Sequence, residues 1–73
     1  MGTVTLEFRN IIDDFAYTSI VSYPHVEHVV ISNSYITISQ VLGYCKYQNI
    51  QVTLKDVFSI KSTGIVFFIL RMV

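Results

Sequence analysis

The chain has 73 residues, which is enough for one small domain, and its five basic and five acidic residues give a formal net charge of zero. It is 52% hydrophobic and only 14% charged, whereas about 25% of the residues in a typical soluble domain are charged. These values exclude a strongly basic surface for nucleic acid and an acidic tail. Because a domain of this size buries only about 60% of its unfolded surface, we expect excess apolar surface to contact another molecule.

The cysteine count and the lengths of the apolar segments indicate the cellular compartment and whether the chain crosses a membrane. Cys45 is the only cysteine, so no disulfide forms within the chain, and this predicts a reducing, intracellular compartment such as the cytoplasm. No apolar segment approaches the roughly 18 residues of a membrane-spanning helix, so no transmembrane segment is predicted. We therefore expect a single β-rich domain over residues 1–73.

The first pattern along the chain lies at residues 3–9, where Val4, Leu6 and Phe8 alternate with polar residues and predict a half-buried strand. Residues 10–23 allow two interpretations. Asn10 is a suitable helix cap with two aspartates in the following turn, which favours a short helix near residues 11–20. The many β-branched and aromatic residues of the same segment favour a strand instead.

The middle of the chain predicts a hairpin and then further short strands. Residues 26–39 form two apolar runs around Asn33–Ser34, a turn signal, and Ile36 and Ile38 should face the core. After a break at Gly43, a short strand is expected over 44–47 and a turn over 48–49. Alternation then resumes at residues 50–55, and extended chain follows a bend at Asp56.

The C-terminal part of the chain, from residue 61 onward, has the clearest strand pattern in the sequence. Residues 61–64 end in Gly64 and predict a hairpin loop, followed by a closing strand over 65–71. Six consecutive apolar residues, 65–70, place apolar side chains on both faces of that strand. Phe67 and Phe68 point in opposite directions, so one should lie in the core and the other in an interface. The predicted interface residues are Ile65, Phe67, Phe68 and Leu70.

These elements together predict a mainly β fold. About six short strands, separated by turns every eight to twelve residues, indicate a small antiparallel barrel, a sandwich or a curled sheet.

No catalytic, cofactor-binding or metal-ligating residue is predicted, and we do not expect an enzyme. The segment from His25 to His28 matches neither spacing of the zinc-enzyme motifs that it resembles in composition. Cys45 has no histidine near it in the sequence to activate it. Tyr44, Lys46 and Tyr47 resemble a base-stacking patch, but the chain has too few basic residues for a nucleic-acid groove, so nucleic acid is not an expected partner.

The sequence therefore favours a non-enzymatic protein–protein interaction or assembly module that acts as a homo-oligomer or within a larger complex. Compact chains of this kind are frequent among viral, phage and mobile-element accessory proteins. One alternative is a module that binds lipid or another apolar ligand in a channel between two copies. A second alternative is a small barrel that binds nucleic acid.

Overall fold

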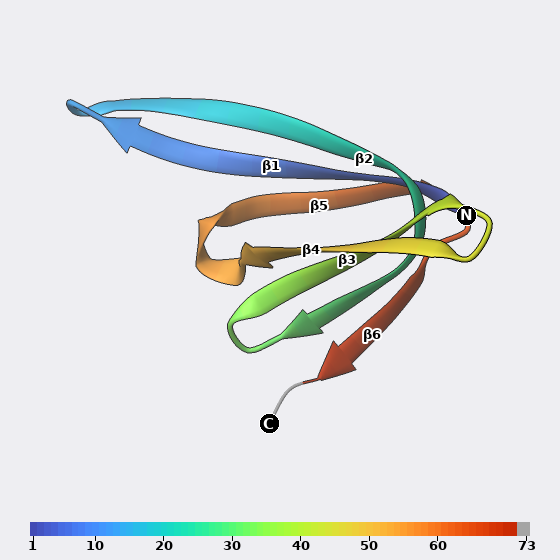
Figure 1. Ribbon diagram of the computed structural model, residues 1–73. Coiled ribbons are helices and arrows are strands. Elements are labelled where there is room, and N and C mark those ends of the chain that lie inside the picture. Colours follow the sequence, from blue (N-terminus) through green and yellow to red (C-terminus); the bar gives the residue numbers. More distant parts are fainter. Residues whose placement is uncertain (72–73) are drawn as a thin grey trace.

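The structure is a computed structural model that describes residues 1–71, and it is almost entirely β (Figure 1). This confirms the mainly β class and the expected number of strands. The elements are β1 (Gly2–Ile12), β2 (Phe15–Ser32), β3 (Tyr35–Gly43), β4 (Lys46–Thr53), the 3-10 turn η1 (Leu54–Asp56), β5 (Val57–Gly64) and β6 (Phe67–Arg71).

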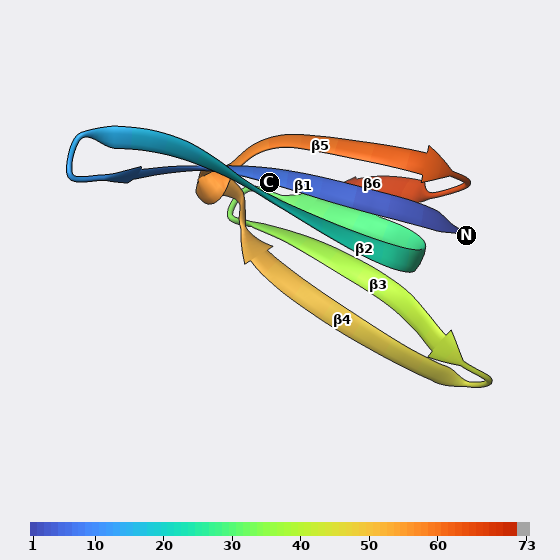
Figure 2. The same cartoon turned by 90° about the horizontal axis from the view of Figure 1, so that it is seen from above.

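The strands form one curled sheet in the order β4-β3-β2-β1-β5, and β6 is added to β2 (Figures 1 and 2). All neighbours are antiparallel except β6, which runs parallel to β2. Within the described residues β4 and β5 are not paired with each other, so the sheet does not close. Of the three expected architectures, the curled sheet is therefore the one that forms.

A sharp bend in β2 produces the curl. The first half of β2 pairs with β1, and the second half, from Val26 onward, pairs with β3. Pro24 and His25 lie between the two ladders. Proline has no N–H to donate, and His25 has a φ of 56°, so neither residue suits a regular ladder. One strand thus belongs to both halves of the sheet, which face each other across the core (Figure 1).

The core lies inside this curl and is small. Its fully buried side chains come in pairs from three strands: Val4 and Leu6 from β1, Val26 and Val29 from β2, and Ile36 and Ile38 from β3. The predicted faces of residues 3–9 and of the 26–39 hairpin are therefore confirmed. Ile50 and Val52 of β4 pack against this cluster and remain partly exposed.

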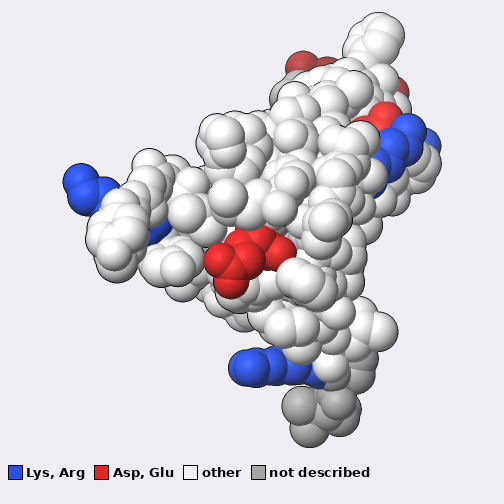
Figure 3. Space-filling model, turned by 90° about the vertical axis from the view of Figure 1, so that its right-hand side faces the viewer, with Lys and Arg blue, Asp and Glu red and all other residues white. Residues whose placement is uncertain are grey.

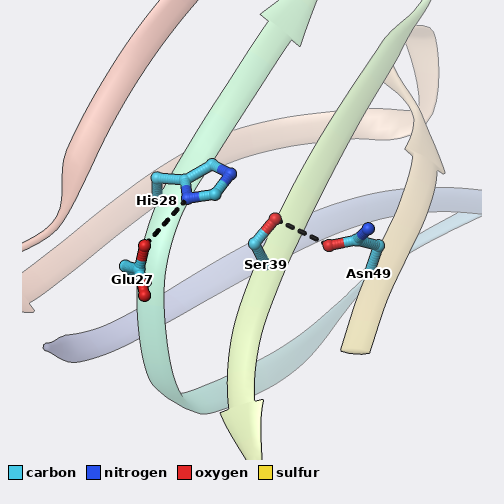
Figure 4. Close-up of polar contacts among 4 residues, drawn as sticks. All are labelled: Glu27, His28, Ser39 and Asn49. Carbon is cyan, nitrogen blue, oxygen red and sulfur yellow. Dashed lines mark hydrogen bonds and ion pairs between the residues drawn. The ribbon is translucent and has the colours of Figure 1, made fainter. Parts of the chain in front are cut away.

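Buried polar groups beside the core are paired. Gln40 is nearly buried, and its side-chain Nε2 donates a hydrogen bond of 2.9 Å to the carbonyl of Pro24, at the β2 bend. Ser39 donates one of 2.7 Å to the side-chain oxygen of Asn49 on β4 (Figure 4). The backbone N–H of Leu54 donates to the carbonyl of Ser34, which ties η1 to the β2–β3 turn. These contacts hold the bend and the connection from β4 to β5.

The expected helix near residues 11–20 does not form. Residues 11 and 12 complete β1, residues 13 and 14 form a turn, and residue 15 begins β2. Asp13 and Asp14 both have positive φ values, 50° and 67°, as a two-residue hairpin turn of type I′ requires. The strand preference of Tyr17, Thr18 and Ile20 therefore outweighs the capping signal, because β1 offers these residues a complete pairing partner.

Three further boundaries differ from the sequence expectations. The short strand expected over 44–47 is instead the turn at Tyr44–Cys45 and the start of β4, and the turn expected over 48–49 is regular β4 strand. Residues 61–64 belong to β5 rather than to a hairpin loop. The chain does reverse after Gly64, whose φ is +81°, but β6 then pairs with β2 and not with β5.

Candidate interaction surface

The closing strand β6 lies at an edge of the sheet. It occupies the edge of β2 that β1 leaves free: β1 pairs with β2 as far as Val26, and β6 pairs with it from His28 to Ser32. Among the described residues β6 has no second neighbouring strand. Its outer edge therefore presents unpaired backbone N–H and C=O groups, the feature that allows one sheet to add a strand from another.

The side chains of β6 are exposed on both of its faces. Phe68 and Leu70 lie beside Val29 and Ile31, on the side of the sheet that carries the core, whereas Phe67 lies beside His28 on the other side. The two phenylalanines thus point in opposite directions, as predicted. The expectation that one of them is buried is wrong, because Phe67 is 65% exposed and Phe68 is 44% exposed.

The geometry of the edge explains this result. A strand packed between two neighbours would bury one face, but β6 is only five residues long and is attached to the sheet on one side. The core beneath it is already closed by Val26 and Val29. Of the four predicted interface residues, three lie on β6 and Ile65 lies in the connection before it, and all four are exposed: Ile65, Phe67, Phe68 and Leu70.

A second exposed apolar feature was missed by the sequence analysis. The β1–β2 hairpin extends beyond the rest of the sheet as a two-stranded arm, at the upper left of Figure 1. The arm comprises residues 9–18, beyond the last β1–β5 pair at Phe8 and Val57. Its exposed large apolar side chains are Ile11, Ile12, Phe15 and Tyr17. The strand-favouring composition of residues 15–21 was the available signal for this arm.

The molecule is less compact than a monomer of its mass should be. Its accessible surface is 5310 Å², whereas a folded monomer of 8.4 kDa exposes about 4,600 Å². Its radius of gyration is 13.2 Å, against about 11 Å for a compact domain of this length. The excess of about 700 Å² is close to the roughly 800 Å² that each partner contributes to a standard protein–protein interface.

The histidine segment forms a single ion-pair contact. His28 Nδ1 lies 3.7 Å from a carboxylate oxygen of Glu27, at an irregularity in the β2–β3 ladder (Figure 4). In residues 1–71, no three side chains of the metal-binding types come together. His25 instead lines a shallow surface depression of about 160 Å³, together with Pro24 and the first three residues of the chain. Cys45 is exposed in the β3–β4 turn.

Charged side chains are scattered rather than grouped. The five basic residues lie on separate elements, and Arg9 stacks over the Phe58 ring at 4.1 Å from its centroid. Figure 3 shows broad uncharged surface on one side of the molecule, interrupted by small separate groups of charge. A partner for this side would therefore meet mainly uncharged side chains.

A scan against protein-family models found no match to this chain, and searches of curated proteins and of solved structures also found none. In the part of the chain that the structure describes, no helix has the length and apolar character needed to span a membrane.

Proposed function

We propose that this protein is a non-enzymatic assembly module that acts as a homo-oligomer, and that two copies associate through β6. The observation that carries the proposal is the uncovered apolar strand at the sheet edge. Residues 67–70 are all apolar, and each of them is at least 41% exposed. The excess surface of the monomer supports the same conclusion, because association would remove from water about as much area as the monomer exposes in excess.

The pairing that fits this strand is antiparallel, about a two-fold axis. If the axis passes beside Ile69, Arg71 of one copy lies opposite Phe67 of the other. A parallel pairing in register would instead place the two Arg71 side chains together, and like charges on adjacent strands are destabilising. The antiparallel arrangement also brings each guanidinium near an aromatic ring, a favourable contact.

The apolar side chains of this surface favour association. Burying one phenylalanine contributes about 1.5–3 kcal/mol, and each copy offers two of them beside Ile69 and Leu70. A formal net charge of zero adds no long-range repulsion between copies.

A matched pair of leucine variants tests the proposal. Leu70 and Leu42 are both exposed, by 69% and 56%, but only Leu70 belongs to β6. Leu70→Asp should leave the chain folded and should weaken association at least tenfold, since a buried unpaired charge costs more than about 1.4 kcal/mol. Leu42→Asp should keep the wild-type mass. Sedimentation velocity across a range of concentrations measures both.

Several outcomes would contradict the proposal. A wild-type protein that stays monomeric at high micromolar concentration removes the homo-oligomer. Equal masses for wild type and Leu70→Asp remove β6 as the interface. A native mass spectrum with the added mass of an acyl chain would favour the lipid-binding alternative. Binding to single-stranded nucleic acid that weakens steeply with salt would favour the nucleic-acid alternative.

A further inference from the structure

We infer that the arm, residues 9–18, is a second association surface and that it docks on the arm of another copy of this chain. The inference rests on the proposed self-association, but it uses different residues at a different place in the fold. In both Figure 1 and Figure 2 the arm projects to one side, away from β6.

One face of the arm continues the face of β1 that carries the core. In the β1–β2 ladder, Leu6 lies opposite Val21 and Phe8 opposite Ser19. The next pairs on that face are Asn10 with Tyr17 and then Ile12 with Phe15. The row that begins inside the core therefore runs out along the arm, where Ile12 is 55% exposed and Phe15 is 77% exposed. We call the apolar side chains of this row that belong to the arm, Ile12, Phe15 and Tyr17, the arm stripe.

The arm stripe has no charged residue. Arg9 lies on the other face of the arm, where it pairs with Thr18. Asp13 and Asp14 form the turn at the tip of the arm. A two-stranded hairpin is marginally stable in water unless its apolar face is covered. Within residues 1–71 no further strand pairs with the arm, because β5 ends its pairing with β1 at Phe8.

A second arm is the occupant that the distribution of charge on the arm favours. If two arms pack face to face and antiparallel about a two-fold axis, their tips lie at opposite ends and the four aspartates stay apart. A parallel arrangement would bring these four carboxylates together, which like-charge repulsion opposes. The stripe is uncharged along its length, so it can face a copy of itself without burying a charge.

Two self-complementary surfaces on one chain make an assembly larger than a dimer. If β6 joins one pair of copies and the arms join another, the result is a closed tetramer with crossed two-fold axes or an alternating chain of copies. The same protein with only one of these surfaces would stop at a dimer.

The experiment compares adjacent isoleucines on opposite faces of the arm. Ile12 belongs to the stripe, whereas Ile11 lies on the other face, opposite Ala16, and is 72% exposed. Ile12→Thr and Ile11→Thr make the same chemical change and retain a β-branched residue. Ile12→Thr, with Phe15→Thr as a second stripe variant, should weaken assembly at least about tenfold and leave dimers. Ile11→Thr should keep the wild-type mass distribution. Circular dichroism confirms that each variant is folded.

Combination with Leu70→Asp separates this inference from the proposed function. The double variant Ile12→Thr/Leu70→Asp should be monomeric, whereas each single variant should be dimeric. If the stripe variants keep the wild-type mass while Leu70→Asp lowers it, the arm inference is wrong and β6-mediated association stands. If the stripe variants yield monomers directly, the arm is the sole contact and the role proposed for β6 is wrong. A monomeric wild type overturns both.

Discussion

At the scale of single residues, stability depends on very few side chains. Of residues 1–71, which the structure describes, only six apolar residues are fully buried, and Leu6 is among the largest of them. Ser39 and Gln40 are buried beside them, and each has a hydrogen-bond partner. A core this small has little reserve, so the loss of one large side chain should remove a substantial part of the total stability.

Two leucine-to-alanine variants test this prediction. Leu6→Ala should lower the free energy of unfolding by about 2–5 kcal/mol, because it removes buried methyl groups and leaves a cavity. Leu42→Ala makes the same change at an exposed position and should cost less than about 1 kcal/mol. Urea titrations at one fixed protein concentration give both values. Similar losses for the two variants would show that the residues identified as the core are not the core.

At the scale of elements, two irregular positions direct the strands. Because of the bend at Pro24 and His25, β2 pairs with β1 in one half of the sheet and with β3 in the other half. The reversal after Gly64 carries the chain from β5 to the part of the β2 edge that β1 leaves free. A β-carbon at position 64 would lie 3.0 Å from the backbone of Met1 and Gly2, and φ there is positive. The close backbone contact and the positive φ at position 64 both require glycine.

Gly64→Ala should therefore destabilise the fold by more than about 1 kcal/mol, since alanine must adopt a left-handed conformation against fixed backbone. Gly43→Ala is the control, because a β-carbon there meets no atom within 4 Å. We expect that variant to be neutral or stabilising by up to about 1 kcal/mol. Thermal and urea unfolding measure both. A Gly64→Ala protein as stable as wild type would mean that the β5–β6 reversal is not held in this conformation.

At the scale of the whole molecule, apolar surface remains after the fold is complete. The curled sheet buries one small core and leaves β6 and the arm stripe in water. Both features are strand surfaces at the periphery, where the chain has no further element to cover them in the described residues. Their exposure makes the folded monomer an intermediate in assembly under the proposed function.

This view predicts a melting temperature that depends on concentration. Self-association stabilises the folded state by mass action, so the wild-type melting temperature should rise as protein concentration increases. The Ile12→Thr/Leu70→Asp double variant should show no such rise, because both surfaces are altered. Differential scanning calorimetry at several concentrations compares the two proteins. A flat wild-type dependence would contradict self-association by either surface.

The sequence alone determined the features that depend on residues close together in the chain. Alternation at residues 3–9 identified the faces of β1, and Asn33–Ser34 identified the β2–β3 turn. The apolar run at residues 65–70 identified a closing strand with apolar side chains on both faces. These predictions succeeded because side-chain alternation and turn chemistry are local properties of the backbone.

Only the tertiary structure decided which strands are neighbours and which faces remain uncovered. Residues 11–20 carry both helix-cap and strand signals, and the competition is resolved by pairing with β1. The pattern of residues 65–71 cannot reveal that they pair with β2 rather than with β5, so it also cannot reveal that both phenylalanines are exposed. Burial is a property of the neighbours that a residue acquires, and the neighbours of β6 come from a strand more than thirty residues away in the sequence.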